Sequence, residues 1–352
     1  MVERRFGIAP ATAREQLQKK QTPAPTEGVQ PLPPGSGGRA TPGGVGITET
    51  DPLKFFVIGD HGGIMDPNPQ NAVSNAMQAA IASGRAPAFV YSVGDWVYFN
   101  GDEADWPSQF YEPYAHLNVP MVGIPGNHDG DTSDDPSRKP LDAWMANLCS
   151  SAPALPSGAE EYERDTETQP WCDWTLELQA LTVVGVYTNV PSGGHLEQSQ
   201  IEWLTGELEA ADAGKPLIVA LHHPPYSCDQ HHGGSQAMGT VLDGAFQASK
   251  RCPDLVLTGH VHDYQRFSRT YSGRQIVYVV IGNSGYHNLH LLAPDAKPGE
   301  ELAPGVTFEY GDASEWGFLS LTVSGATISG EYTGVAKDGT TTPNKDSFVT
   351  NP

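Results

Sequence analysis

The chain has 352 residues, enough for one large domain or two small ones with a sizeable core. Its 20 basic and 42 acidic residues give a net charge of −22, which argues against non-specific binding to nucleic acid and against docking on anionic membranes. An anionic ligand would therefore need a local positive centre, such as bound metal ions, to overcome the field of the whole chain.

Targeting and membrane signals are missing from the sequence. No apolar run approaches the roughly 20 residues of a membrane span. The opening residues, MVERRFGIAP, lack the apolar stretch of a secretory signal. Either the protein is cytoplasmic or a leader has been removed, and we favour a soluble protein that is secreted or periplasmic.

We divide the chain into three parts. Residues 1–50 are expected to form an arm or linker, with a short polar helix over Ala11–Lys20 and then a Pro- and Gly-rich stretch from Gln21 to Thr50. Residues 51–340 would form the main domain, and residues 341–352 a C-terminal tail.

The main domain has the pattern of an α/β fold, in which short apolar runs alternate with helical segments. The runs predicted to be buried strands are Lys54–Ile58, Ala88–Val93, Pro120–Ile124, Pro216–Leu221 and Asp254–Leu257. The predicted helices are Leu141–Leu148, inside a polar insertion over 130–170, Gln198–Ala211 and Ser235–Lys250. Later strands are predicted at Gln275–Ile281, Phe318–Val323 and Ala326–Tyr332.

Four cysteines are spread over the domain, and their spacing fits no CxxC zinc or redox pattern. Three disulfide pairings are possible. We favour Cys149–Cys172 together with Cys228–Cys252, because each would close a loop beside a predicted core element. Four free thiols in a reducing compartment are the alternative.

Each of the five buried-strand runs leads within a few residues into side chains that can bind metal. In chain order these side chains are Asp60, Asp95, Asn127 with His128, His222, and His260 with His262. In α/β sheets, ligands bind outside the carboxyl ends of the strands, so we expect the loops to bring these groups together. A glycine precedes the polar group in four of the five cases and permits a tight turn.

The donor types are those of a two-metal phosphoryl-transfer site. Carboxylate and amide oxygens with imidazole nitrogens suit iron, manganese or zinc. Two such ions about 3.5–4 Å apart can clamp the attacking and leaving oxygens of an in-line displacement. A single Gly-Asp at a strand end is usually a turn or a helix cap. Five such features in order, each behind an apolar run, are hard to assign to chance.

These motifs resemble those of the calcineurin-like metallophosphoesterases and, within them, the small single-domain purple acid phosphatases. The family pattern is GDxG, GDxxY, GNH[DE], VxxH and GHxH. The chain has GDHG at 59–62, GDWVY at 94–98, GNHD at 126–129, VALH at 219–222 and GHVH at 259–262. The resemblance covers roughly residues 53–335. It implies a sandwich of two mixed β-sheets flanked by helices, with 51–340 as the catalytic domain.

One position favours the purple acid phosphatases over the wider superfamily. The superfamily places a metal-binding His where this chain has Gly62, and His61 stands one residue too early, so we expect it to be a turn or pocket residue. Purple acid phosphatases supply the lost ligand from a Tyr of the second motif, which matches Tyr98. The resemblance therefore implies Fe(III) plus a second divalent metal, which would be Fe, Zn or Mn.

The resemblance implies seven metal ligands, with Asp95 bridging the two ions. The residues that would hold the ferric ion are Asp60, Asp95, Tyr98 and His262. Those that would hold the divalent ion are Asp95, Asn127, His222 and His260. The alignment leaves His223 as a pocket-wall or supporting residue. Asp263 could orient a ligating imidazole or be solvated, and Trp96 and Tyr91 are expected in the core.

Three further histidines are candidates for catalysis. His128 is not a family ligand, so its imidazole could meet a phosphate oxygen or protonate the leaving group. His231 and His232 follow His222 by nine and ten residues, where family members place histidines that contact substrate. The alternative is that adjacent histidines merely decorate an exposed loop.

The sequence thus predicts an enzyme that hydrolyses phosphate monoesters by attack of a metal-bound hydroxide. A phosphodiesterase or nucleotide hydrolase of the same superfamily is the alternative, and a non-catalytic scaffold on the same fold is a remote one. A calcium-binding surface protein lacks support from any EF-hand pattern. The expected partner is a small-molecule phosphate ester, with neither nucleic acid nor membrane, and the oligomeric state is open.

Overall fold

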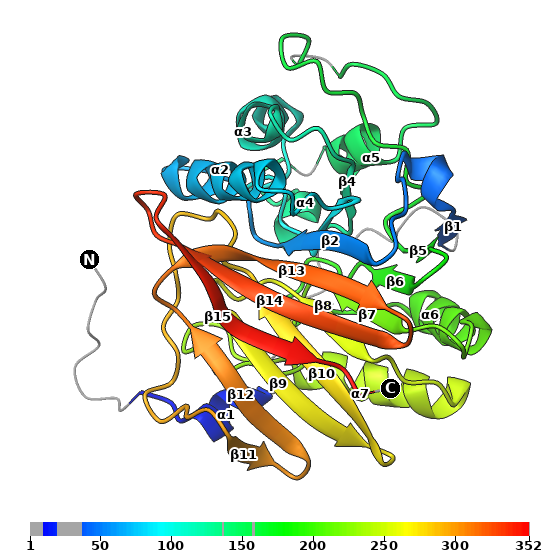
Figure 1. The fold of residues 1–352 in the computed structure, drawn as a ribbon, viewed down its shortest axis with the longest axis vertical. Helices are drawn as coiled ribbons and strands as arrows, with labels where there is room; N and C mark the ends of the chain where they lie inside the picture. The colour runs from blue at the N-terminus through cyan, green and yellow to red at the C-terminus, as the bar shows by residue number, and fades with distance from the viewer. Residues whose placement is uncertain (1–9, 20–36, 136, 157–158, 352) are drawn as a thin grey trace.

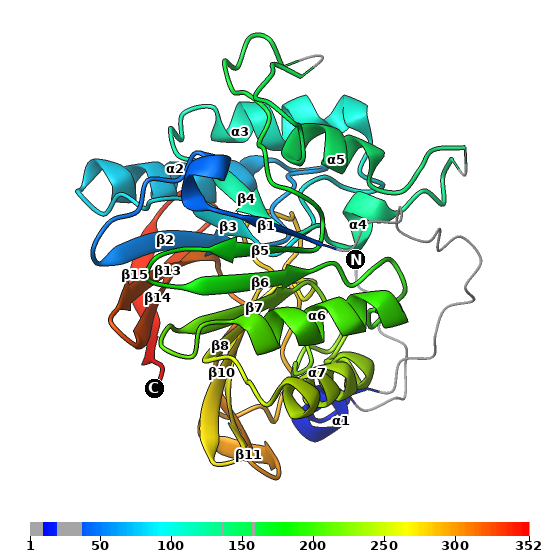
Figure 2. The same cartoon turned by 90° about the vertical axis from the view of Figure 1, so that its right-hand side faces the viewer.

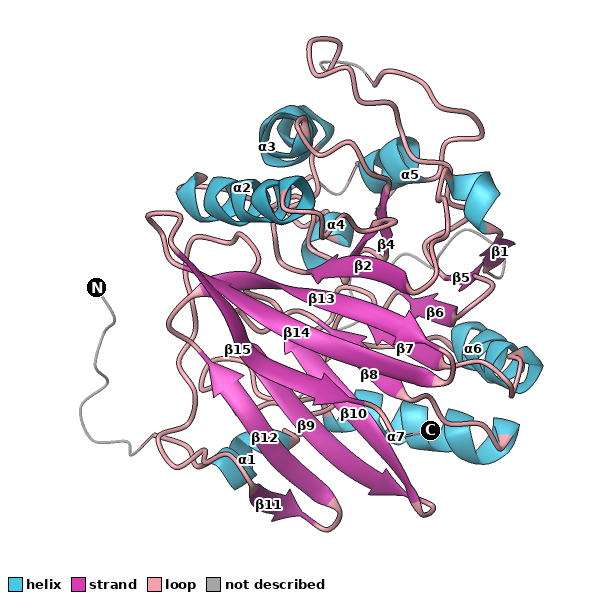
Figure 3. Ribbon diagram, in the orientation of Figure 1, coloured by secondary structure: helices cyan, strands magenta, loops and turns pink. Residues whose placement is uncertain are grey.

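The computed structural model describes residues 10–19, 37–135, 137–156 and 159–351. Two mixed β-sheets pack face to face, and helices cover the outer face of each sheet (Figures 1 and 2). This four-layer arrangement is the sandwich that the sequence predicted. Figure 3 shows how much of the domain is strand and how the helices stand outside the two sheets.

One sheet has six strands, in the order β15-β14-β13-β2-β3-β4. Its strands are β2 (Leu53–Ile58), β3 (Val90–Ser92), β4 (Met121–Gly123), β13 (Trp316–Ser324), β14 (Thr327–Val335) and β15 (Thr341–Val349). Strands β2, β3 and β4 are parallel, whereas β13, β14 and β15 add to β2 in antiparallel fashion. The carboxyl ends of three successive strands therefore meet at one edge.

The other sheet has nine strands, in the order β1-β5-β6-β7-β8-β10-β9-β12-β11. Its strands are β1 (Gly38–Ala40), β5 (Trp174–Glu177), β6 (Thr182–Val186), β7 (Leu217–Leu221), β8 (Leu255–Thr258), β9 (Tyr264–Tyr271), β10 (Arg274–Ile281), β11 (Glu300–Ala303) and β12 (Val306–Asp312). The central strands β6, β7, β8 and β10 are parallel.

The helices lie mostly outside the sandwich. They are α1 (Ala13–Leu17), α2 (Asn68–Ala82), α3 (Glu112–Tyr114), α4 (Asn127–Gly130), α5 (Asp142–Leu148), α6 (Gln198–Ala210) and α7 (Gln236–Ser249), with shorter helical turns at Pro42–Val45, Glu103–Asp105 and Pro107–Tyr111. Helix α2 contacts β13 and β14 of the six-stranded sheet. Helices α6 and α7 pack together on the nine-stranded sheet (Figure 2).

The alternation of side chains along β2 explains why this strand is buried on both faces. Phe55 and Val57 enter the core between the two sheets. Phe56 and Ile58 point the other way and pack with the residues of α2. Because successive side chains of a strand point to opposite faces, a run that is apolar throughout must lie between two covering layers.

The predicted elements of the main domain form, with ends shifted by no more than three residues. Ile201, Leu204 and Leu208 lie on one face of α6, and Leu204 and Leu208 are buried while Ile201 is half-buried. The sequence did not single out α2, nor β5, β6, β9, β11 or β12. Within the described residues, no helix combines the length and the apolar character needed to cross a membrane.

Both terminal segments contribute to the fold more than we expected. Helix α1 occupies part of the predicted Ala11–Lys20 helix, and most of the predicted linker lies outside the described residues. Strand β1, within the described part of that linker, pairs with β5. The C-terminal segment that we predicted to be a tail contains β15, which pairs with β14 along most of its length.

The two favoured disulfides are not formed, and this prediction was wrong. All four cysteines are free, and Cys172 and Cys228 are buried. They pack within the apolar clusters of the two outer layers, where a thiol behaves as a small hydrophobic side chain. The cysteines therefore give no indication of an oxidising compartment.

Candidate metal centre

The candidate ligands lie where strands of both sheets end. The residues that follow β2, β3 and β4 of the six-stranded sheet are Asp60, Asp95 and Asn127. Those that follow β7 and β8 of the nine-stranded sheet are His222, His260 and His262. The six-stranded sheet thus supplies the oxygen donors of one constellation and the nine-stranded sheet supplies its imidazoles.

Glycines allow the loops that carry these groups to turn sharply and pack closely. The backbone φ angles of Asp60, Asp95 and His260, each preceded by a glycine, are 52°, 56° and 66°. Gly94 has a φ of 109°, and a Cβ atom there would lie 2.6 Å from the backbone nitrogen of Gly126. The left-handed backbone therefore falls on the three ligand residues and on Gly94, and at Gly94 a glycine is also required by the close approach of the next loop.

The first half of the constellation contains Asp60, Tyr98 and His262. The Tyr98 hydroxyl donates to Asp60 Oδ1 at 3.3 Å and lies 3.4 Å from His262 Nε2. His262 Nδ1 lies 3.2 Å from the carbonyl oxygen of Asn288. Because a carbonyl can only accept, Nδ1 carries the proton, and the Nε2 lone pair faces the phenol and the carboxylate.

The second half contains Asp95, Asn127, His222 and His260. His222 Nε2 lies 3.3 Å from Asp95 Oδ2 and 3.1 Å from Asn127 Oδ1. His260 Nδ1 lies 2.9 Å from the same amide oxygen. His222 Nδ1 donates to the carbonyl oxygen of Val93 at 2.9 Å, which holds its ring in place and directs Nε2 into the site.

The electrostatics of the constellation fit a pair of cations. Asp60 and Asp95 are almost completely buried. Burial raises the pKa of Asp60 to about 8, and burial together with the carboxylates of Asp95 and Asp60 raises the pKa of Tyr98. In the part of the chain that the structure describes, no Lys or Arg pairs with either carboxylate, and their ion-pair partners are His222 and His262. Buried anionic donors without a cationic side chain are what a metal site requires.

Comparison with known proteins places the chain in a family. Residues 53–264 match the family of calcineurin-like phosphoesterases. The chain belongs to this family. The family membership that we predicted from the five motifs is thereby confirmed. Related sequences and a related fold show which members of the family the chain resembles.

The relatives of this calcineurin-like phosphoesterase include plant purple acid phosphatases. Purple acid phosphatase 22 of Arabidopsis thaliana is 28% identical over 245 residues, covering 67% of this chain and 51% of that protein. Probable purple acid phosphatase 20 of the same plant is 32% identical over 141 residues, covering 37% of this chain and 32% of that protein. The chain thus spans about half or less of the length of these relatives.

A similar fold occurs in a purple acid phosphatase of known structure. The structure of the enzyme PPD1 from yellow lupin seeds aligns with a TM-score of 0.61 and 19% sequence identity. The alignment covers 86% of this chain and 54% of the lupin chain. At this identity the likeness bears on the fold, and it confirms the predicted sandwich of two mixed sheets.

His128 belongs to the GNHD motif, and one of its two ring nitrogens already forms a hydrogen bond within the protein. Its Nδ1 donates to the carbonyl oxygen of Phe99 at 2.6 Å, and its ring lies 4.6 Å from that of Tyr98. Its backbone N–H donates to Asp95 Oδ1 at 3.0 Å. The side chain is half-buried, so Nε2 is the nitrogen left to meet another group.

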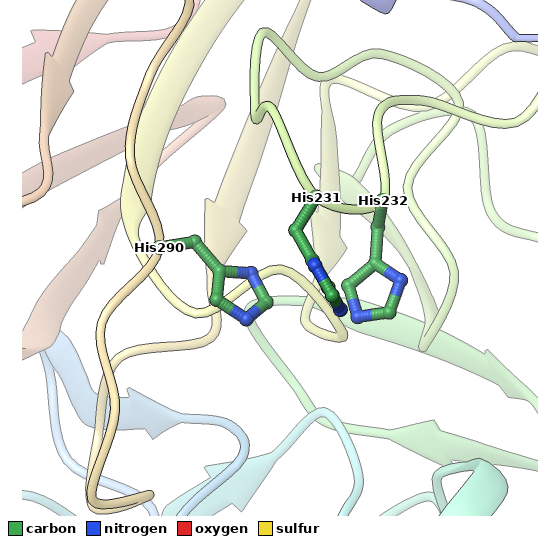
Figure 4. Close-up of side chains that lie close together, drawn as sticks. All are labelled: His231, His232 and His290. Carbon is green, nitrogen blue, oxygen red and sulfur yellow. The ribbon is translucent and has the colours of Figure 1, made fainter. Parts of the chain in front are cut away.

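The loop after β7 carries His231 and His232, which lie side by side (Figure 4). The ring centroid of His232 lies 4.2 Å from that of His260. Both loop histidines also lie beside His290, a residue of the segment after β10 that the sequence analysis did not select. No local pattern marks His290, and only the folded chain places it here.

Asp129 is a second residue whose role the sequence analysis missed, although it is the last residue of the GNHD motif. Its carboxylate accepts from the backbone nitrogens of Gly126 at 2.7 Å, Trp96 at 3.0 Å and Val97 at 3.1 Å. One buried carboxylate therefore ties the loops of the second and third motifs together.

Three neighbouring predictions have different outcomes. His61 is buried away from the constellation, with Nε2 3.1 Å from Ser92 Oγ. His223 is a buried supporting residue, with its ring 4.3 Å from that of His260. Both readings of Asp263 were wrong, because its buried carboxylate accepts from Gln265 Nε2 at 2.9 Å as β9 begins.

Proposed function

We propose that this calcineurin-like phosphoesterase is a binuclear-metal phosphatase that hydrolyses phosphate monoesters. The observation that carries the proposal is the convergence of hard oxygen donors and oriented imidazoles from two sheets. The proposed ligands are Asp60, Asp95, Tyr98, Asn127, His222, His260 and His262. The similarity to purple acid phosphatases supports the same reading, and the proposed substrate is a small-molecule phosphate ester.

The two halves of the constellation would hold two different ions. Asp60, Tyr98 and His262 suit Fe(III), while Asn127, His222 and His260 suit a divalent Fe, Zn or Mn ion. Asp95 would bridge them. When bound, the ions would supply Lewis-acid polarisation of the phosphoryl group and lower the pKa of the attacking water.

The histidines around the constellation would handle the substrate. His128 offers Nε2 alone, because Phe99 occupies its Nδ1, so a proton for the leaving oxygen would pass through that atom. His231 and His232 stand on the adjoining loop, where they would bind the phosphate oxygens that the ions leave uncovered. The Asp95 carboxylate accepts the backbone N–H of His128. This bond would keep a fixed distance between His128, the proposed proton donor, and Asp95, the proposed bridging ligand.

The ferric assignment predicts a coloured protein. We expect one iron and one further metal per chain, with a broad visible absorption that Tyr98→Phe abolishes, because the phenolate donor is lost while the ring is kept. Elemental analysis with a visible spectrum of the oxidised protein measures both. Tyr286→Phe is the control, since its ring lies 4.3 Å from that of His262 and it is not a proposed ligand.

The metal analysis and the visible spectrum, together with a substrate assay, separate the alternative functions. A colourless oxidised protein that prefers phosphodiesters would favour the phosphodiesterase or nucleotide-hydrolase reading, whereas a protein that binds no metal would favour a scaffold. The assay compares p-nitrophenyl phosphate with its bis-ester. A secreted or periplasmic location stays a prediction.

Replacing His128 with Ala should slow turnover of a phosphate monoester by about 100-fold, the scale of one general acid or base. Metal content should stay unchanged, because the side chain is not a proposed ligand. The measurement is kcat beside elemental analysis. His195→Ala is the matched control, since this exposed histidine pairs with Glu197 on the surface. Wild-type kcat in His128→Ala would remove His128 from the mechanism.

A further inference from the structure

Three histidines form a cluster beside the proposed two-metal centre. We call His231, His232 and His290 the histidine trio (Figure 4). Each has a ring nitrogen that lies within 4.8 Å of a ring nitrogen of the other two. Two members come from the loop between β7 and α7 and one from the segment after β10, so the fold itself brings them together.

A single buried carboxylate positions all three members. Asp229 Oδ2 accepts the backbone N–H of His231 at 3.0 Å and of His232 at 2.7 Å. The same oxygen lies 3.3 Å from His290 Nδ1. Asp229 Oδ1 is fully buried and has no hydrogen-bond partner among the described residues. Histidines that are merely exposed on a solvated loop would not be held in place by a buried carboxylate.

The contact between Asp229 and His290 sets the direction of the imidazole. Nδ1 of His290 is also 3.4 Å from the backbone nitrogen of His262. The charge-assisted bond to the carboxylate is the stronger of the two, so we place the proton on Nδ1. Nε2 then keeps its lone pair. A carboxylate behind an imidazole is the usual arrangement around histidines that bind metal.

We propose that the histidine trio binds a further divalent cation, separate from the two ions of the first centre. Three ring nitrogens this close together can all point at one ion and serve as its nitrogen donors. Three imidazole nitrogens and one open position match the coordination that Zn²⁺ adopts in His₃ sites. The charge of Asp229 would offset part of the charge of the ion.

Zinc in the trio would affect the substrate, and this consequence rests on the proposed function. His231 and His232 cannot bind phosphate oxygens through nitrogens that hold zinc. We therefore expect zinc in excess of the first two ions to compete with the phosphate ester. The deciding experiment measures zinc directly, so that its failure is distinct from a failure of the phosphatase proposal.

The experiment titrates the purified protein, with the metals it carries, with Zn²⁺ alone. Calorimetry and elemental analysis after gel filtration should find one further zinc per chain in the wild type and none in His290→Ala. His231→Ala should also lose it, and because His231 is exposed, this variant decides the question if His290→Ala does not fold. Asp229→Asn should weaken the affinity about 10- to 100-fold.

His195→Ala is the control and should keep the further zinc, because this histidine lies outside the trio. Absence of the further zinc from the wild type would overturn the proposal, as would its retention in both trio variants. A loss of more than one ion from His231→Ala would also overturn it, because the trio would then belong to the first centre.

Discussion

Replacing Asp95 with Ala is expected to remove bound metal and phosphatase turnover together. Asp95 Oδ2 lies 3.3 Å from His222 Nε2, and its other oxygen accepts the backbone N–H of His128. The negative charge of Asp95 also helps to raise the pKa of Tyr98, a proposed ligand of the ferric ion. Loss of metal activation, worth several kcal/mol, corresponds to a fall in kcat of about 10³-fold or more.

The measurement pairs metal content per chain with kcat. Asp95→Asn keeps the shape of the side chain and should lose most of the same metal, because the negative charge is gone. Asp131→Ala is the control, since this residue follows the third motif and its carboxylate accepts the backbone N–H of Ser133. Two ions and full turnover in Asp95→Ala would eliminate Asp95 as the bridge.

Removing the metals by chelation is expected to lower the thermal stability of the whole domain. The donors come from both sheets, so bound ions link the two layers, and the buried carboxylates lose their counter-charge when the ions leave. Each ion present at 100 times its Kd contributes about 2.7 kcal/mol. For a chain of this size we expect Tm to fall by about 5 °C or more.

Scanning calorimetry before and after chelation measures this effect. Adding metal back should restore Tm, which distinguishes metal loss from irreversible damage. Asp95→Ala should respond little to the chelator, because it has already lost its ions. An unchanged Tm in wild-type protein shown to be free of metal would mean that the ions do not link the sheets.

The buried strands were predictable because each is apolar on both faces. Strand β2 packs against the second sheet through Phe55 and against α2 through Phe56, so apolar side chains occupy both of its faces from Phe55 to Ile58. Strand β15 was mistaken for a tail because its first half is exposed. Its position depends on pairing with β14, which is a tertiary contact that leaves no pattern in its own residues.

The residues of the candidate site likewise fall into those that local sequence identifies and those that only the folded chain brings together. Asp60, Asp95 and Asn127 each follow a recognisable strand and a glycine, so local sequence was enough to select them. His290 has no such signal, because its contact with Asp229 and its approach to His231 and His232 arise only when two distant segments meet. The disulfide prediction failed for a related reason, since spacing along the chain cannot show that a thiol is packed in an apolar layer.

The short helix α1 lies against the loop that carries His231 and His232, two members of the histidine trio. The carbonyl oxygens of Gln16 and Leu17 accept the backbone N–H groups of Gly234 and Ser227, which flank that loop, and the Gln16 side chain donates to Gln230. A protease that trimmed the amino terminus past α1 would strip these partners away. Processing at one end of the polypeptide could in this way adjust how firmly the enzyme holds an anion, with every proposed ligand of the two-metal centre still in place.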